Sequence, residues 1–228
     1  INLKYLHDKR YISYKNMFKS RQIFNFDFLF DDISNKYDIF DWESFNDKTK
    51  KYEVVATDVI TGESRFFDKN NCSDIISAVK ASASMPVMSK MIDVEGRKYL
   101  DGGISTSIAY KRAFDVGYSK AIVVLTREEG YRKKPVNMIN ESIYRRYFKP
   151  LPNLVEKLMT VPERYNKMQE EMEELAKEGK LLIIRPQNKV TVQRLEHSSV
   201  KLEKLYNEGY EEGLKNIENI KNFIALKF

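Results

Sequence analysis

The segment "IDVEGRKYLDGG", residues 92–103, constrains the fold of this chain more than any other stretch. Two short strand-like runs flank Glu95-Gly96, and a two-residue loop that ends in glycine predicts a tight β-hairpin. The second strand is followed directly by Asp101–Gly103. Asp-Gly is an ordinary turn signal, so a plain turn is the first interpretation. The alternative is that the glycines let the backbone pass close to a neighbour, or take positive φ, and leave the Asp101 carboxylate pointing into a cleft.

The region before this hairpin predicts one more hairpin and a helix. Residues 51–67, "KYEVVATDVITGESRFF", predict two strands joined through Thr61-Gly62. Residues 72–85, "CSDIISAVKASASM", predict a helix with Ser73 as its N-cap, which Pro86 ends. The N-terminal stretch to about Asn46 is rich in aromatic residues and has poor periodicity, so short helical pieces and a packed loop are expected there.

The region after the hairpin alternates helices and strands. A short helix over residues 107–117 is expected to stop at Gly117, and the apolar run Ala121–Leu125 follows it. Such a run is typical of a strand covered on both faces in an α/β sheet. The later elements are a helix from Pro162, with Pro162 in its first turn, to Gly179; a short buried strand, "LLIIRP"; and a final helix over residues 200–224 whose apolar stripe is expected to face the core. One α/β domain over residues 1–228 is the interpretation.

Composition excludes several classes of protein. No apolar run approaches the roughly 20 residues that a membrane-spanning helix needs, and the first residues are charged where a signal peptide is apolar. One cysteine, Cys72, and two histidines, His7 and His197, give neither a disulfide framework nor a metal site. We therefore expect a cytoplasmic protein without metal or cofactor. A net charge of +6 favours anionic partners, but no motif for nucleic-acid binding is present.

One segment, residues 130–154, concentrates basic and aromatic side chains. The mixture suits an interfacial helix with aromatic rings at the lipid headgroups and cations on the phosphates. It equally suits a helix that packs on the core and keeps its charges in water. The side chains concerned are Arg132, Lys133, Lys134, Arg145, Arg146 and Lys149, beside Tyr131, Tyr144, Tyr147 and Phe148.

Three stretches together resemble a known family. They are "ASASMP" (residues 81–86), "YLDGGI" (residues 99–104) and "KAIVVLT" (residues 120–126), in this order. They resemble the patatin-like phospholipases, and within these a bacterial branch of serine esterases. Residues 52–67 and 202–213 are also similar to family segments, so that the ordered set covers most of the chain between Tyr52 and Gly213. The D-G-G motif alone is weak, whereas the ordered set is fairly specific.

The resemblance implies a fold and a reaction. The implied fold is a three-layer α/β/α sandwich with a mostly parallel central sheet. The implied activity is hydrolysis of acyl esters of lipids by a Ser-Asp dyad, without a histidine. Matched to the family motif, Asp101 is the base that takes the proton of the serine hydroxyl, and Gly102 and Gly103 form its turn. The basic and aromatic segment, and not the resemblance, is the reason to expect a peripheral contact of this cytoplasmic protein with an anionic membrane surface.

The sequence also departs from the family. The G-x-S-x-G nucleophile elbow and the glycine-rich oxyanion loop precede the family's equivalent of residue 1. The chain is therefore expected to be an N-terminally truncated domain, inactive alone, whose nucleophile is not among residues 1–228. Ser82 and Ser84 lack an elbow around them, so they are expected to be caps or pocket lining. The alternative is a non-catalytic chain that binds a lipid or a protein. The sequence does not determine whether copies of the chain form a homo-oligomer.

Overall fold

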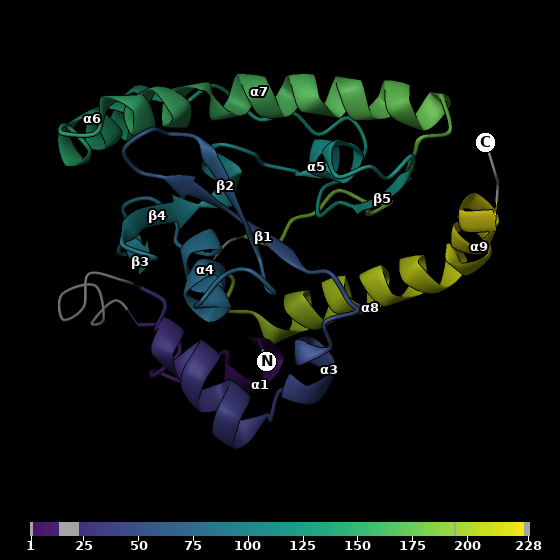
Figure 1. Cartoon of the computed structure of the whole chain (residues 1–228), viewed down its shortest axis with the longest axis horizontal. Helices are drawn as coiled ribbons and strands as arrows, with labels where there is room; N and C mark the ends of the chain where they lie inside the picture. Colours follow the sequence, from purple (N-terminus) through teal and green to yellow (C-terminus); the bar gives the residue numbers. More distant parts are fainter. Residues whose placement is uncertain (1, 14–22, 194, 226–228) are drawn as a thin grey trace. The chain divides into compact units, whose positions relative to one another are not determined.

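The computed structural model of the chain describes residues 2–13, 23–193 and 195–225. The chain forms two compact units. We call residues 7–107 and 135–162 the hairpin unit, and residues 1–6, 108–134 and 163–228 the C-terminal unit. The elements of both are labelled in Figure 1. The interpretation of one domain over residues 1–228 stays a prediction.

The hairpin unit contains a four-stranded antiparallel sheet with the strand order β2-β1-β4-β3. Its two predicted hairpins are confirmed, and the first pairs Val55 with Phe66 and Thr57 with Ser64. In the second, Glu95 and Gly96 both have positive φ, as the two central residues of a tight hairpin require. The strands are β1 (Glu53–Asp58), β2 (Ser64–Asp68), β3 (Ile92–Val94) and β4 (Arg97–Asp101).

Helices cover both faces of this sheet. The helical segments of the unit are η1 (Phe28–Tyr37, a π-helix), α3 (Trp42–Asn46), α4 (Ile75–Ser82), the 3₁₀ turn η2 (Gly102–Ile104), α6 (Met138–Tyr147) and the start of α7 (Pro152–Lys177). The sequence predicted α4, but its cap is Asp74, which accepts the Ser77 N–H, and not Ser73. The helix also ends at Ser82, before Pro86. Part of the N-terminal stretch, residues 14–22, lies outside the described residues.

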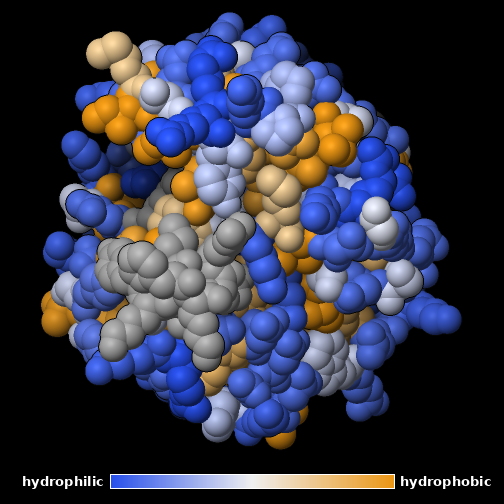
Figure 2. Space-filling view, turned by 90° about the vertical axis from the view of Figure 1, so that its left-hand side faces the viewer, coloured by the Kyte–Doolittle hydropathy of each residue, from blue (hydrophilic) through white to orange (hydrophobic). Residues whose placement is uncertain are grey.

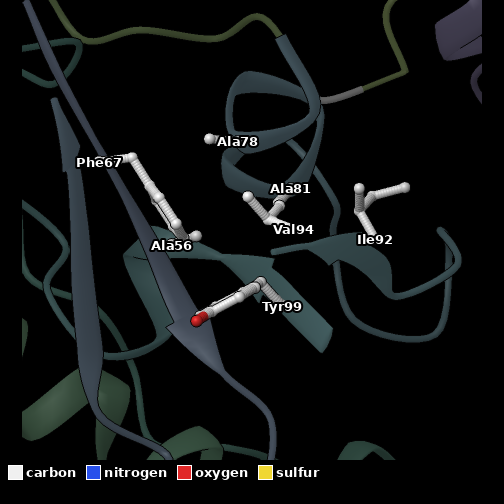
Figure 3. Packing of buried hydrophobic residues seen from close by; sticks show 7 residues of the cluster. All are labelled: Ala56, Phe67, Ala78, Ala81, Ile92, Val94 and Tyr99. Carbon is white, nitrogen blue, oxygen red and sulfur yellow. The ribbon is translucent and has the colours of Figure 1, made fainter. Parts of the chain in front are cut away.

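Two apolar clusters hold the sheet between these helices. Figure 3 shows the first, in which Ala78 and Ala81 of α4 face side chains of the sheet, among them Phe67 and Tyr99. The small alanines let α4 approach the strands closely. The second cluster joins the sheet to α6 and α7 through Val59, Leu100, Ile104, Phe148, Leu154, Val155 and Leu158. Tyr99 and Leu100 belong to different clusters, so β4 is buried on both faces just before Asp101.

The C-terminal unit contains a two-stranded parallel sheet. Its elements are α1 (Asn2–Tyr5), α5 (Tyr110–Asp115), β5 (Ala121–Val124), the rest of α7, β6 (Leu181–Ile184), α8 (Ser199–Lys215) and α9 (Ile217–Ala225). Tyr110, Val123 and Met172 lie in its buried cluster. The predicted stop at Gly117 is confirmed by its positive φ. The helix predicted from Pro162 begins at Pro152 instead, so this proline lies inside α7.

The predicted fold class is wrong. No mostly parallel central sheet is formed by the described residues: the antiparallel sheet and the parallel β5-β6 pair are separate. The short loops at Thr61-Gly62 and Glu95-Gly96 leave no room for the crossover that parallel neighbours require, so each joins antiparallel strands. Among the described strands, only β5 and β6 are linked through a long helix, and only they pair in parallel.

Two predictions of burial are also wrong. The run Ala121–Leu125 is not covered on both faces, because Val124 is 73% exposed. The apolar stripe of the last helix does not face a core: no buried side chain is found along α8 or α9 as described, and Tyr206 is 64% exposed. Periodicity identifies an apolar face but does not say what covers it. None of the helices in the described part of the chain combines the length and the apolar character that a bilayer crossing demands.

Candidate functional site at the Asp-Gly-Gly turn

Asp101 is the last residue of β4, and its backbone and side chain are both held. Its N–H donates to the Ser84 carbonyl oxygen at 2.9 Å. Its own carbonyl oxygen accepts the Thr57 hydroxyl at 2.8 Å, and its carboxylate Oδ1 accepts the Gly103 N–H at 2.7 Å. The side chain is half-buried. These contacts fix the place of the carboxylate at the end of a strand that is buried on both faces.

Gly102 is required because the turn runs against β1. A Cβ at this position would overlap the Val55 carbonyl oxygen and would lie only 2.7 Å from the Val55 Cγ1. A Cβ at Gly103 would meet only the Asp101 carboxylate, at 3.0 Å from Oδ1. Neither glycine has positive φ. Of the two reasons for glycine that the sequence left open, close approach is therefore the one that applies, and it applies at Gly102.

A network of hydroxyl groups lies beside the turn. The Thr57 Oγ1 is 2.8 Å from the Ser105 Oγ, which in turn accepts the Ser64 hydroxyl at 3.1 Å. The Ser64 and Thr106 hydroxyl oxygens are 2.6 Å apart. The Ser105 N–H also donates to the Thr57 Oγ1, at 3.1 Å. Thr57 thus connects both sides of the Asp-Gly-Gly turn from the middle of the sheet.

Replacing Thr57 by valine is expected to lower the free energy of unfolding by about 1–3 kcal/mol. The side chain is fully buried, and valine of similar shape would leave the Asp101 carbonyl and the Ser105 N–H without this partner. Urea denaturation measures the loss. Thr57→Ser keeps the hydroxyl and removes a methyl group, so we expect it to cost less. A valine variant as stable as the parent would show that the hydroxyl does not matter, and a serine variant less stable than the valine variant would show that the methyl group contributes more than the hydroxyl.

Ser84 does not have the surroundings of a nucleophile. Its hydroxyl is fully buried and donates to the Lys80 carbonyl oxygen at 2.8 Å, one turn back along the chain. Ser82 is the half-buried last residue of α4. Ser107, after the turn, donates its hydroxyl to the Gly103 carbonyl at 2.9 Å. The structure therefore places these serines around the turn, with the hydroxyls of Ser84 and Ser107 bonded to backbone oxygens.

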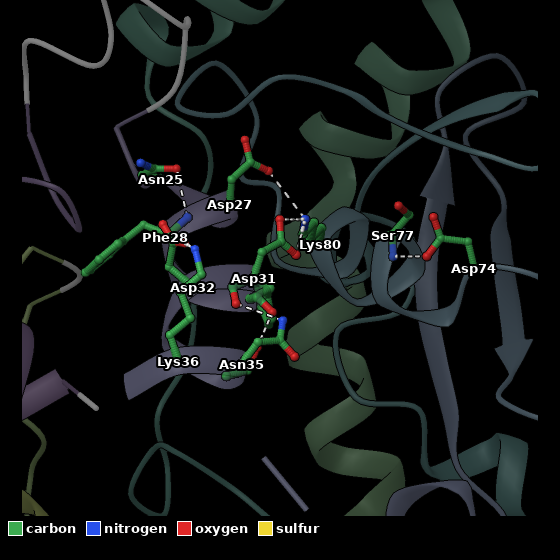
Figure 4. A network of polar contacts seen from close by, with 12 residues as sticks. Asn25, Asp27, Phe28, Asp31, Asp32, Asn35, Lys36, Asp74, Ser77 and Lys80 are labelled. Atoms are coloured by element: carbon green, nitrogen blue, oxygen red, sulfur yellow. Dashed lines mark hydrogen bonds and ion pairs between the residues drawn. The ribbon is translucent and has the colours of Figure 1, made fainter. Parts of the chain in front are cut away.

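Lys80 connects the helix that precedes Ser84 to η1. Its ammonium lies 2.9 Å from the Asp31 carboxylate and 3.4 Å from that of Asp27, as Figure 4 shows. Burial alone would lower the pKa of Lys80, but the hydrogen bonds and charges of Asp31 and then Asp27 outweigh it and raise this pKa. Since the Ser84 carbonyl accepts the Asp101 N–H, the network anchors the helix end on which the turn rests.

A second carboxylate of the same sheet has a structural role. Asp58 is buried at the end of β1 and accepts the N–H groups of Ile60 and Thr61. It also forms an ion pair with Arg97 at 2.8 Å. These contacts close the first hairpin and occupy the carboxylate. Residues 2–13, 23–193 and 195–225 contain no group of three or more histidine, cysteine or carboxylate side chains that could hold a metal ion.

The basic and aromatic segment is divided between the two units. Tyr131 lies in the C-terminal unit and its ring packs edge-on against Tyr165. The Lys133 ammonium lies over the Tyr165 ring at 4.2 Å. Residues 138–149, with α6, belong to the hairpin unit. Tyr144 and Phe148 pack in the second cluster of that unit, so the packed-stem interpretation holds for these two side chains.

Comparison with known families matches residues 151–225 to a domain of unknown function, DUF6363. The matched region contains α7, β6, α8 and α9. No patatin family accompanies this match. None of the curated proteins matches the chain. The Asp-Gly-Gly turn lies outside the matched region, so its chemistry has to be argued from its own geometry.

Proposed function

We propose that the intact protein is a serine acyl hydrolase similar to the patatin-like phospholipases, and that Asp101 is its general base. Its substrates are acyl esters of lipids, and the nucleophilic serine comes from residues other than 1–228. The proposal takes its reaction type from the order of family-like segments in the sequence and its structural support from the Asp-Gly-Gly turn. It does not rest on a parallel sheet, which the described residues do not form.

The observation that carries the proposal is how tightly the turn is built. A turn that only reverses the chain at the surface tolerates many residues, because nothing lies against it. Here the backbone of Gly102 touches that of Val55, and Asp101 is held at its N–H, its carbonyl and its carboxylate. A general base needs this kind of fixed position, since an alcohol becomes a good nucleophile only when a base is aligned with its proton.

The proposed reaction has two steps. In the first, the serine oxygen attacks the ester carbonyl carbon while Asp101 takes the hydroxyl proton, and the alcohol leaves with that proton. In the second, water attacks the acyl-enzyme, Asp101 takes a proton from the water, and the carboxylic acid leaves as the serine oxygen regains a proton. The Gly103 N–H, bonded to Oδ1, holds the plane of the carboxylate through both steps.

A fluorophosphonate probe, which reacts covalently with activated serines, tests the proposal. We expect the protein, as produced from its gene, to be labelled at one serine outside residues 1–228. Residues 1–228 produced alone should remain unlabelled, because no serine among them is expected to be activated. Absence of labelling in the intact protein would overturn the proposal and would favour a chain that binds a lipid or protein without turnover.

A further inference from the structure

Helix α6 has an apolar face that the hairpin unit does not cover. Tyr144 and Phe148 pack in the second cluster, whereas a neighbouring face of the helix carries other large side chains at helical spacing. Met138 and Ile139 are 86% and 73% exposed, and Ile143 and Tyr147 are 41% and 50% exposed. Residues 139, 143 and 147 are each four positions apart, so they form one stripe along the helix.

Figure 2 shows the side of the molecule on which this helix lies. Blue, hydrophilic side chains cover most of the view, and orange, hydrophobic ones form several separate groups, one of them at the upper left. A group of exposed apolar side chains on one short helix is more informative than single ones scattered over a surface.

The charges beside this stripe are mostly positive. Residues 138–149 contain three cationic side chains, Arg145, Arg146 and Lys149, and one acidic side chain, Glu141. Glu141 pairs with Arg145 at 2.8 Å. Arg146 and Lys149 are exposed and have no ion-pair partner among the residues that the structure describes. The charge that remains is positive and lies at the C-terminal end of α6.

A hollow of about 350 Å³ lies between the C-terminal end of α6 and the first turns of α7. Val155 and Met159 give it an apolar lining, and Arg145 and Lys149 supply cations. Pro152, Glu156 and Thr160 complete the lining. Apolar surface beside cations matches the boundary of a bilayer, where acyl chains meet phosphate groups.

We propose that α6 docks the hairpin unit reversibly on an anionic lipid surface. Its exposed stripe, Ile139, Ile143 and Tyr147, enters the interface together with Met138 at the start of the helix, while Arg146 and Lys149 contact lipid phosphates. The positive charge selects an anionic bilayer over another apolar protein face. The inference goes beyond the proposed hydrolysis, since docking requires neither Asp101 nor a nucleophile. Residues 130–134 of the basic and aromatic segment are not part of the proposed docking surface, because they belong to the C-terminal unit.

Co-sedimentation of the intact protein with vesicles tests the docking. We expect binding to phosphatidylcholine vesicles that contain phosphatidylglycerol, much weaker binding to phosphatidylcholine alone, and release by added salt. The double variant Arg146→Gln/Lys149→Gln should weaken binding to anionic vesicles by about 25-fold. Each cation near the surface contributes about fivefold to the binding constant, and the two factors multiply. The double variant Ile139→Ser/Ile143→Ser should weaken it at least as much, because apolar burial is lost.

Matched variants elsewhere in the hairpin unit serve as controls. Lys48→Gln/Lys51→Gln removes two exposed lysines that follow α3, and Ile39→Ser removes an exposed isoleucine between η1 and α3. We expect the first control to lower vesicle binding by less than about threefold, through net charge alone. The second control should leave binding unchanged.

Three results would overturn the inference. They are equal binding to neutral and anionic vesicles, equal effects of the α6 variants and their controls, and α6 variants that abolish self-association instead of vesicle binding. The Asp101→Asn variant should bind vesicles like the parent protein. A protein that binds vesicles but hydrolyses no ester would therefore contradict the proposed function and leave the docking surface standing.

Discussion

Asp101→Asn in the intact protein is expected to lower ester turnover by about 10³–10⁴-fold. An amide oxygen can still accept the Gly103 N–H, which Asp101 Oδ1 accepts at 2.7 Å, so the turn should keep its shape. The amide cannot take the proton of a serine hydroxyl, and the loss should therefore fall on kcat. The free energy of unfolding should change by no more than about 0.5 kcal/mol.

Asp93→Asn is the matched control for this variant. Asp93 lies on the adjacent strand β3, and its carboxylate Oδ1 accepts the Gly96 N–H at 3.0 Å, in the same kind of contact. It is exposed and lies at the opposite end of the β4 hairpin from Asp101. We expect ester turnover of this variant to equal that of the parent. Turnover of Asp101→Asn within tenfold of the parent would remove Asp101 from the role of base.

The local elements of the fold were predictable because their signals are local. Glu95-Gly96 and Thr61-Gly62 fix their hairpins through turn conformation, which depends on the residues of the loop itself. Gly117 ends α5 for the same reason, with φ near +96°. The N-cap of α4 was assigned to the wrong residue because Ser73 and Asp74 are adjacent and both are good N-cap residues. Asp74 caps the helix, whereas the Ser73 N–H and hydroxyl donate to Glu95.

The arrangement of the strands was not predictable in the same way. An apolar run such as Ala121–Leu125 indicates a strand, but its composition does not say which strands lie beside it or what covers its faces. The antiparallel sheet was in fact present in the sequence as two hairpins, and only the pairing of β1 with β4 had to be added. The resemblance to a family with a parallel sheet outweighed that local evidence and led to the wrong fold class.

The candidate site was predictable in part. Asp101 and its glycines stand out in the sequence, but the residues that hold them are distant along the chain. Thr57 and Ser105 are 48 positions apart and meet only because β1 pairs with β4. The signals for Thr57 were its place at the end of an apolar strand before Asp58 and the similarity of this strand pair to a family segment, and neither says what the Thr57 hydroxyl contacts. No sequence motif identifies Val55, whose backbone carbonyl lies against Gly102.

Gly102→Ala is expected to lower the free energy of unfolding of the hairpin unit by about 3 kcal/mol or more. The added methyl group would overlap the carbonyl oxygen of Val55 and lie 2.8 Å from its carbonyl carbon. Backbone atoms cannot move aside as a flexible side chain can. Relief therefore requires β1 and β4 to separate next to the paired residues Ala56 and Asp101. The fluorescence of Trp42, the one tryptophan of the chain, reports unfolding of this unit in urea.

Two further glycine variants separate this clash from the general effect of replacing glycine. Gly103→Ala adds the same methyl group one residue later, where it meets only the Asp101 carboxylate, so we expect a loss below about 1 kcal/mol in stability but a clear loss of ester turnover. Gly209→Ala, in α8 of the C-terminal unit with nothing within 4 Å, should raise the free energy of unfolding of that unit by about 0.5–1 kcal/mol, measured by far-ultraviolet circular dichroism because Trp42 lies in the hairpin unit. If Gly102→Ala unfolded at the same urea concentration as Gly103→Ala, the contact with Val55 would not be what selects glycine here. The turn could then be an ordinary chain reversal, and the main support for a fixed catalytic carboxylate would be lost.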